Sequence, residues 1–261
     1  MNLPIAIQGR IADCIQLTYR TPADSVRGLL PAGLELVQRG PWAFWSVVIS
    51  RVEKARPMGL PALCGVSYCQ VAYRLKVQAM NDRAEVVSGL YFVRSDVDGR
   101  AVSVLGNKLA DFKMHSAAVS LETDDCGVCC RVQGTAGGEG DVLIEAAHAP
   151  ARLSAGSCFP TVEDARRFCA FAPNGLSVVQ VGEQRRLRIT RVVREQSPWS
   201  QTPVVLHEAR LGFFDAMGQT ELAALEWASR HSGERIRVQV GETALLLQQL
   251  RVVNEAVLAT G

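Results

Sequence analysis

The chain has 261 residues, of which 48% are apolar and 21% are charged, a composition typical of globular proteins and unlike that of disordered or fibrous chains. The 28 basic and 26 acidic residues leave a net charge of +2, which argues against a polyanion-binding surface, so we expect no nucleic-acid partner. The sequence has neither a run of 18 apolar residues nor the features of a signal peptide, so we expect no membrane association and a cytoplasmic protein.

The first half of the chain predicts a series of strands interrupted by one short helix. Ile11–Leu17 favours a strand, and Thr21 is expected to cap a helix that begins at Pro22. Trp42–Ile49 is apolar and β-prone, which predicts an interior strand. Val66–Val77 alternates, as expected for a strand with two different faces. One face then carries Val71, Tyr73, Leu75 and Val77, and the other carries Tyr68, Gln70, Ala72 and Arg74.

The second half predicts more strands and few helices. We expect strands over Ala84–Ser95 and Ala101–Leu105, joined by a turn at Asp96–Gly99, and then a short helix or an irregular crossing segment over 106–115. Thr161 and Asp164 resemble a capping box that opens a helix over 162–170. Further strands are expected over Ala117–Glu122, Val128–Gly134, Asp141–Ala147, Leu187–Val192, Val204–Phe214 and Arg235–Val240. This pattern predicts a single β-rich α+β domain over residues 1–261, closed so that its sheet edges are protected.

The eight cysteines do not form a metal-binding pattern. Cys126, Cys129 and Cys130 contain one CxxC, but a structural zinc site needs four ligands, and neither a second pair nor a paired histidine motif follows. We therefore expect no metal and interpret the cluster as small buried thiols beside a strand. Lysine is rare: only Lys54, Lys76, Lys108 and Lys113 could supply an amine for chemistry.

The order of four motifs resembles the acetoacetate decarboxylase-like superfamily, including an uncharacterised branch of it. The motifs span roughly residues 10–215, and the family fold is a cone-shaped, mainly antiparallel β-barrel with a few short helices. The resemblance implies a homo-oligomer with a central pocket for a small keto acid or related carbonyl compound, and no bound cofactor. The motifs are Tyr19-Arg-Thr21 followed by Leu30-Pro-Ala-Gly-Leu34-Glu35, Tyr68-Cys-Gln70, Leu105–Phe112, and Pro198-Trp199 before Val204–Phe214.

The resemblance also implies where the chemistry would lie. Family decarboxylases place a reactive lysine in a Pro-Lys-Lys sequence after the aromatic residue that matches Phe112. Without a gap, the reactive position is Met114, with His115 after it; a one-residue deletion instead assigns it to Lys113. The family glutamate corresponds to Gln70, whose amide cannot accept a proton at neutral pH.

Three hypotheses follow. In the first, the protein is a carbon–carbon lyase, of the decarboxylation or the aldol and dehydration type, in which Lys113 forms a Schiff base and Arg10 or Arg74 holds the carboxylate. In the second, His115 serves as the acid/base group while Gln70 orients a carbonyl. In the third, the protein binds a small molecule without turnover, because the lysine pair and the glutamate are not retained. The candidate substrate-binding residues are Arg10, Tyr68, Arg74, Met114 and Trp199.

Overall fold

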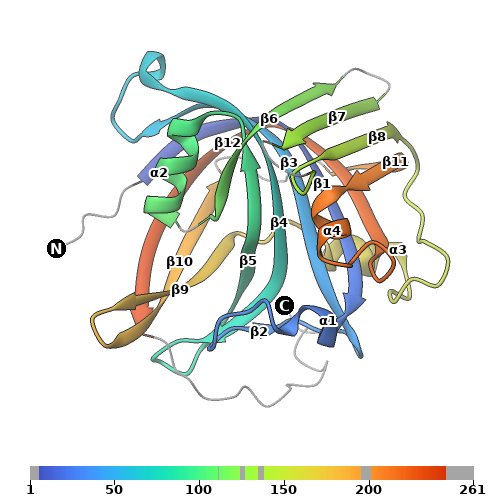
Figure 1. The fold of residues 1–261 in the computed structure, drawn as a ribbon, viewed down its shortest axis with the longest axis horizontal. Helices are drawn as coiled ribbons and strands as arrows, with labels where there is room; N and C mark the ends of the chain where they lie inside the picture. Colours follow the sequence, from blue (N-terminus) through green and yellow to red (C-terminus); the bar gives the residue numbers. More distant parts are fainter. Residues whose placement is uncertain (1–5, 111, 124–126, 135–137, 195–200, 245–261) are drawn as a thin grey trace.

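The computed structural model describes residues 6–110, 112–123, 127–134, 138–194 and 201–244, which fold mainly into strands (Figure 1). The strands are β1 Ala6–Pro22, β2 Glu35–Leu36, β3 Trp42–Pro57, β4 Val66–Met80, β5 Val86–Val97, β6 Met114–Thr123, β7 Gly127–Gly134, β8 Val142–His148, β9 Asn174–Val181, β10 Gln184–Arg194, β11 Thr202–Leu211 and β12 Ala224–Ala244. The helices are α1 Ala23–Arg27, α2 Arg100–Ala110, α3 Val162–Phe168 and α4 Gly212–Ala216, with a 3-10 turn at Ala62–Cys64. No helix of the described residues is long and apolar enough to cross a membrane.

Seven strands close into a barrel in the order β1-β3-β4-β5-β9-β10-β12, with β12 pairing back onto β1. All of these pairs are antiparallel except β5 and β9, which meet in parallel at Leu90 and Gly175. The other long strands, β6, β7, β8 and β11, form a second connection between β5 and β12. The predicted α+β, mainly antiparallel fold with a closed sheet is therefore confirmed.

The cavity that Thr190 of β10 shares with β4 identifies the inward face of the barrel; burial alone does not, because Leu187 on the other face of β10 is also buried. On β10 and β12, Thr190 and Ile236 are buried, whereas Arg191 and Gln239 on the opposite face are exposed. Arg74 on β4 lines the same cavity as Thr190, so the face of β4 that carries Arg74 also points inward. The inward face is unusually polar: the buried residues on it include Gln16, Thr18, Ser46, Ser50, Ser229 and His231.

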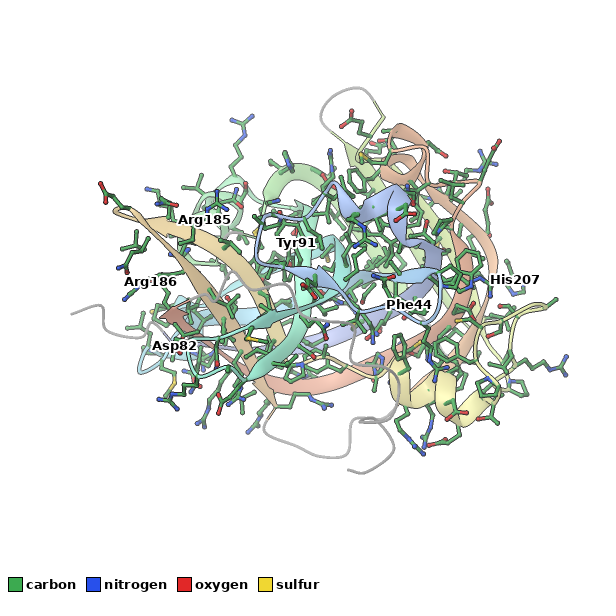
Figure 2. All side chains as sticks on the ribbon, turned by 90° about the horizontal axis from the view of Figure 1, so that it is seen from below. Phe44, Asp82, Tyr91, Arg185, Arg186 and His207 are labelled. Atoms are coloured by element: carbon green, nitrogen blue, oxygen red, sulfur yellow. The ribbon has the colours of Figure 1, made fainter. Side chains whose placement is uncertain are left out.

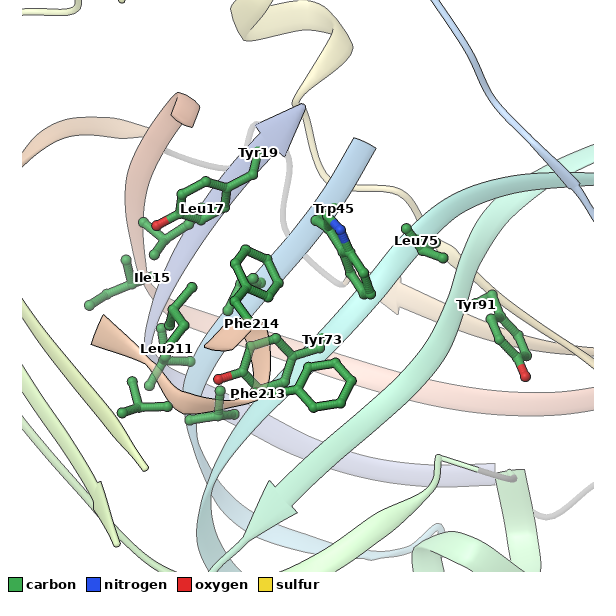
Figure 3. Close-up of a cluster of buried hydrophobic side chains, with 14 of the residues drawn as sticks. Ile15, Leu17, Tyr19, Trp45, Tyr73, Leu75, Tyr91, Leu211, Phe213 and Phe214 are labelled. Carbon is green, nitrogen blue, oxygen red and sulfur yellow. The ribbon is translucent and has the colours of Figure 1, made fainter. Parts of the chain in front are cut away.

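The opposite face of β1, β3 and β4 carries the main hydrophobic core. The predicted stripe on β4 is confirmed, because Val71, Tyr73, Leu75 and Val77 are fully buried there. The rings of α4 complete this core: Phe213 lies 4.8 Å from the ring centroid of Tyr73 (Figure 3). The apolar core thus lies outside the seven-stranded barrel, between its wall and β6, β7, β8, β11 and α4, and the barrel interior is left for polar side chains.

Helix α3 covers part of the inward face. Its predicted cap is confirmed: the Thr161 side chain accepts a hydrogen bond from the Asp164 backbone N–H at 3.1 Å. The helix packs through Ala165 against a second apolar cluster that contains Phe44 of β3 and Trp227 of β12. Segment 149–173, which contains α3, therefore covers the barrel interior near these two strands.

Two predictions of local structure were wrong. The expected strand Ala101–Leu105 is part of helix α2, because Gly99, at φ +107°, ends β5 and accepts a hydrogen bond from the Ser103 N–H. The expected strand Val204–Phe214 ends at Leu211, and Gly212 begins α4 instead. A Cβ on Gly212 would lie 2.2 Å from the Gly138 carbonyl oxygen, so this turn requires glycine.

Three smaller differences concern element ends. Thr21 does not cap α1; it lies in β1, and its hydroxyl donates to the Gln219 Oε1 at 2.8 Å. The final predicted strand is much longer than expected, since β12 runs over Ala224–Ala244. Strand β9, at Asn174–Val181, was not predicted at all.

Candidate functional site

Strand β4 presents two basic side chains to the barrel interior. Arg74 donates from Nη2 to the Ser46 Oγ at 3.0 Å, and its guanidinium carbon lies 5.6 Å from the ring centroid of Phe92. Lys76, two residues further along the same face, donates from Nζ to the backbone carbonyl of Phe168 and lies 4.2 Å from the centroid of that ring. Because Phe168 is the last residue of α3, Lys76 also caps the negative end of this short helix.

Neither cation forms an ion pair with a carboxylate of the described residues. Burial, opposed by Cys169 and assisted by the nearby charge of Arg74, lowers the pKa of Lys76 to about 8. Burial likewise lowers the pKa of Arg74 to about 10. Both side chains are partly buried, and charges withdrawn from water are normally paired, so two neighbouring cations without a carboxylate indicate a place for an anion.

A small cavity of about 40 Å³ lies beside Arg74. Its wall comes from four barrel strands and from two segments outside them. Arg74 is the single charged side chain among the described lining residues. They are Arg74, Leu90, Phe92, Phe112, Phe171, Ala172, Pro173, Asn174, Gly175, Thr190 and Val192.

The segment that leads from α2 into β6 is fixed by hydrogen bonds. The Asn107 side chain bonds both the N–H and the carbonyl of Met114, at 2.6 and 2.9 Å. The Ser95 N–H donates to the carbonyl of Lys113 at 3.0 Å. These bonds hold Lys113 at φ +49°, in the left-handed region that non-glycine residues seldom adopt.

The three consecutive candidates on this segment have different surroundings. Lys113 is partly buried and contacts the Tyr91 hydroxyl, with its Nζ 4.4 Å from that ring centroid. Met114 is buried and packs against Gly106 of α2. His115 is exposed. Tyr91, the contact of Lys113, pairs with Leu75 on the core face of β4, so Lys113 reaches toward the core rather than toward Arg74.

The register places Met114 close to the Arg74 face. Met114 pairs with Ser95 of β5, which pairs in turn with Ala72 of β4, between Gln70 and Arg74. Gln70 and Tyr68 share this face of β4 and are partly buried. Burial, together with the negative charge of Asp98, raises the pKa of Tyr68 to about 12, so its hydroxyl stays protonated at neutral pH. The register thus places Tyr68, Gln70, Arg74 and Met114 on one face, spread along β4 and the adjoining start of β6, and of these four only Arg74 lines the cavity.

Lys113, His115 and Arg10 do not join this group. Arg10 is 52% exposed and forms an ion pair of 3.2 Å with Glu53. Trp199 lies outside the described residues. Cys126 also lies outside them, whereas Cys130 is buried and Cys129 is partly buried. No group of metal-ligating side chains occurs within the described part of the chain.

Sequence reasoning did not select Lys76 as a site residue. Its one available signal was the spacing, because a residue two positions from Arg74 shares its face of a strand. Whether Lys76 points into the barrel or toward solvent depends on how the barrel closes, and the sequence does not show this closure. Figure 2 shows buried and exposed side chains in one view: Phe44 and Tyr91 lie within the fold, and Arg185 and Arg186 lie at its edge.

The comparisons with known proteins agree with this architecture. The profile of DUF2071, described as an uncharacterized conserved protein, matches residues 9–221. Acetoacetate decarboxylase from Legionella pneumophila superposes with a TM-score of 0.61 at 14% identity, covering 95% of this chain and 92% of that one. An acetoacetate decarboxylase-like enzyme from Sphingomonas wittichii RW1 gives 0.62 at 13% identity, covering 94% and 95%.

A third structure is the enduracididine biosynthesis enzyme MppR complexed with pyruvate. It gives a TM-score of 0.57 at 14% identity, covering 94% of this chain and 91% of that one. The comparison with curated proteins found no match. At these identities the structural likeness establishes the acetoacetate decarboxylase-like fold.

Proposed function

The chain belongs to the DUF2071 family and has an acetoacetate decarboxylase-like fold, and on this basis we propose that its barrel interior binds a small keto acid or related carbonyl compound. Arg74 is the carboxylate clamp and Lys76 is the second cation. The observation that carries the proposal is that both side chains point into the barrel without a carboxylate partner among the described residues.

A partly buried charge without a partner of opposite sign destabilises the folded protein. A guanidinium withdrawn from water is stabilised when an anion accepts its hydrogen bonds, and its planar fork fits a carboxylate with two parallel bonds. Arg74 uses Nη2 and Nε on Ser46, at 3.0 and 3.5 Å. It borders an adjoining cavity, so its remaining N–H donors have room for a ligand. Arg10 is less suited to this role, because Glu53 already accepts from it at the surface.

The ligand class is supported by the structural neighbours. MppR, which shares this fold, has been crystallised with pyruvate and with a condensation product of pyruvate and imidazole 4-carboxaldehyde. A cavity of about 40 Å³ holds one or a few water molecules, so a complete keto acid requires the wall to move. The proposed binding mode therefore includes a rotation of the Phe171 ring, which the α3–β9 loop carries, away from the cavity.

Catalysis is a second part of the proposal. We propose a carbon–carbon lyase reaction in which the Lys113 amine attacks the ligand carbonyl, His115 transfers protons and Gln70 orients the carbonyl oxygen. This role requires the Lys113 side chain to leave its contact with Tyr91 on the core face and to turn toward Arg74. Tyr68, Met114 and Trp199 are the proposed further contacts to substrate. Lys76 is a second candidate nucleophile, because its lowered pKa leaves part of the amine neutral near pH 8. Lysine attack would release water and form an imine, which borohydride reduces to a stable adduct.

The alternative is a non-catalytic binding protein that forms a homo-oligomer and retains the barrel. It is favoured by Met114, which occupies the reactive position of the ungapped alignment and cannot form an imine. Borohydride trapping with pyruvate, followed by peptide mass spectrometry, separates the two possibilities. An adduct on Lys113 or Lys76 would support chemistry, and binding of pyruvate with no adduct on any lysine would support the alternative.

Binding itself is tested by isothermal titration calorimetry with pyruvate and acetoacetate. We expect saturable binding to the wild-type protein and at least a tenfold loss for Arg74→Met. Arg27→Met is the matched control, because Arg27 pairs with Asp24 on the surface and its removal is expected to leave the affinity unchanged. If neither keto acid binds the wild-type protein, the proposed function is wrong.

A further inference from the structure

The wall of the Arg74 cavity indicates which keto acid the site accepts. We propose that its ligand is a keto acid with one carboxylate and a flat apolar side chain, of which phenylpyruvate is an example. This inference rests on the proposed function, since it takes Arg74 as the carboxylate clamp. It depends on the chemistry of the lining residues and on the way the α3–β9 loop is attached.

Three phenylalanine rings surround the space next to the guanidinium. Phe92 and Phe112 lie 4.6 Å apart between ring centroids, with an angle of 42° between their planes. Phe92 also contacts Arg74, whose guanidinium carbon is 5.6 Å from its centroid. Phe171 lines the same cavity from the α3–β9 loop. A carboxylate on Arg74 therefore directs the rest of the ligand among aromatic rings, where an offset or edge-on ring is favourable.

The same wall disfavours a second charge on the ligand. Beyond Arg74, the described lining residues contribute apolar side chains, a glycine, Asn174 and Thr190. A distal carboxylate would lose its hydration there without meeting a cation of the wall, which is costly. Lys76 does not line this cavity, and its Nζ donates to the Phe168 carbonyl. The residues that line the cavity therefore favour a keto acid with an apolar side chain over a dicarboxylic keto acid.

The α3–β9 loop is held at both ends and leaves Phe171 between them. The Gln16 Nε2 donates to the carbonyl of Cys169 at 2.6 Å, and the Val192 N–H donates to the carbonyl of Pro173 at 2.7 Å. Phe171 itself lies against the guanidinium of Arg194, 4.9 Å from the ring centroid. Rotation of this ring away from the cavity would make room for a ligand ring without breaking either anchor.

The test compares ligands on the full-length wild-type protein by isothermal titration calorimetry. We expect phenylpyruvate to bind at least tenfold more tightly than pyruvate, and oxaloacetate to bind more weakly than pyruvate. 3-Phenylpropanol, which has the ring but lacks the carboxylate, is expected not to bind measurably. Arg74→Met is expected to reduce phenylpyruvate binding at least tenfold, which links the ring preference to this site.

A variant then tests the aromatic wall. Phe112→Leu is expected to weaken phenylpyruvate at least threefold while changing pyruvate affinity less than twofold, and Leu63→Ala, at an exposed position, is the control. The ligand comparison needs no variant, so it holds even if Phe112→Leu fails to fold. Pyruvate binding equal to or tighter than phenylpyruvate would overturn this inference alone. Failure of every keto acid to bind would overturn the proposed function as well.

Discussion

Arg74 and Lys76 illustrate how one strand can serve two environments. Odd-numbered residues of β4, such as Tyr73 and Leu75, fill the hydrophobic core, whereas the two cations alternate with them and point into the barrel. The alternation was visible in the sequence, which correctly put Arg74 opposite the apolar stripe. What the sequence lacked was any sign that the polar face is enclosed, since an alternating strand normally turns its polar face to water.

Keto-acid affinity should depend on pH through Lys76. Its pKa is lowered to about 8, so the ammonium is mostly present at pH 7 and is lost as the pH rises above 8. We expect the affinity for pyruvate to fall between pH 7 and 9.5, by at most about tenfold per pH unit above 8. Calorimetric titration at several pH values measures this change.

The matched variant is Lys76→Arg, whose guanidinium remains charged over this range. Its affinity should be nearly independent of pH between 7 and 9.5. A wild-type profile as flat as that of Lys76→Arg would show that the Lys76 ammonium does not take part in binding.

His231 should make the protein sensitive to acid. Burial lowers its pKa to about 3, with a further contribution from the charge of Arg194, whereas the unfolded residue titrates near 6.5. Between these values the unfolded state binds more protons, so the free energy of unfolding falls as the pH falls from 6.5 toward 3. The loss attributable to His231 is about 2 kcal/mol at pH 5.

This loss is measured as the difference between wild type and His231→Asn in urea unfolding at pH 7 and pH 5. The difference should shift in favour of the variant at pH 5, and His207→Asn, at an exposed histidine, should show no such shift (Figure 2). Parallel pH dependence in wild type and His231→Asn would contradict the lowered pKa.

At the scale of the elements, helix α2 shows why the local sequence pattern gave a wrong secondary-structure prediction. Ala101–Leu105 contains two valines and reads as a strand, yet these residues are helical. The helix is selected by partners remote in sequence: the side chains of Ser103 and Asn107, one turn apart, both bond the backbone of Met114. Such tertiary contacts override weak propensities, and no spacing rule applied to residues 101–115 alone can detect them.

The junction of β5 and β9 closes the barrel and depends on a glycine. A Cβ on Gly89 would lie 2.6 Å from the Asn174 carbonyl oxygen and 2.8 Å from the Leu176 side chain. We expect Gly89→Ala to force the two strands apart and to lower the free energy of unfolding by about 1–3 kcal/mol, measured by urea unfolding.

Gly28→Ala is the control for this substitution, because a Cβ at Gly28 meets nothing within 4 Å and its φ of −65° suits alanine. It is expected to change stability by less than about 1 kcal/mol. Equal effects of the two substitutions would mean that the close approach of β5 and β9 does not matter for stability.

At the scale of the molecule, the sequence supported the fold class and the family resemblance better than the site. Strands such as β3 and β4 were predictable because their apolar and alternating patterns are strong. The closure of the barrel was not, since it joins Leu90 to Gly175 and β10 to the end of β12 across long stretches of chain. Gln70 was named from the family resemblance and Arg74 as one of two alternative carboxylate clamps, whereas Lys76 became a candidate only because closure of the barrel encloses its face of β4.

The central claim is that this closure creates an anion site inside the barrel. The most direct test is a crystal structure of the protein with a bound keto acid. We expect the carboxylate within hydrogen-bond distance of the Arg74 guanidinium, with the ligand among Phe92, Phe112 and a displaced Phe171. A keto acid bound on the outer surface, or inside the fold without contact to Arg74, would contradict it.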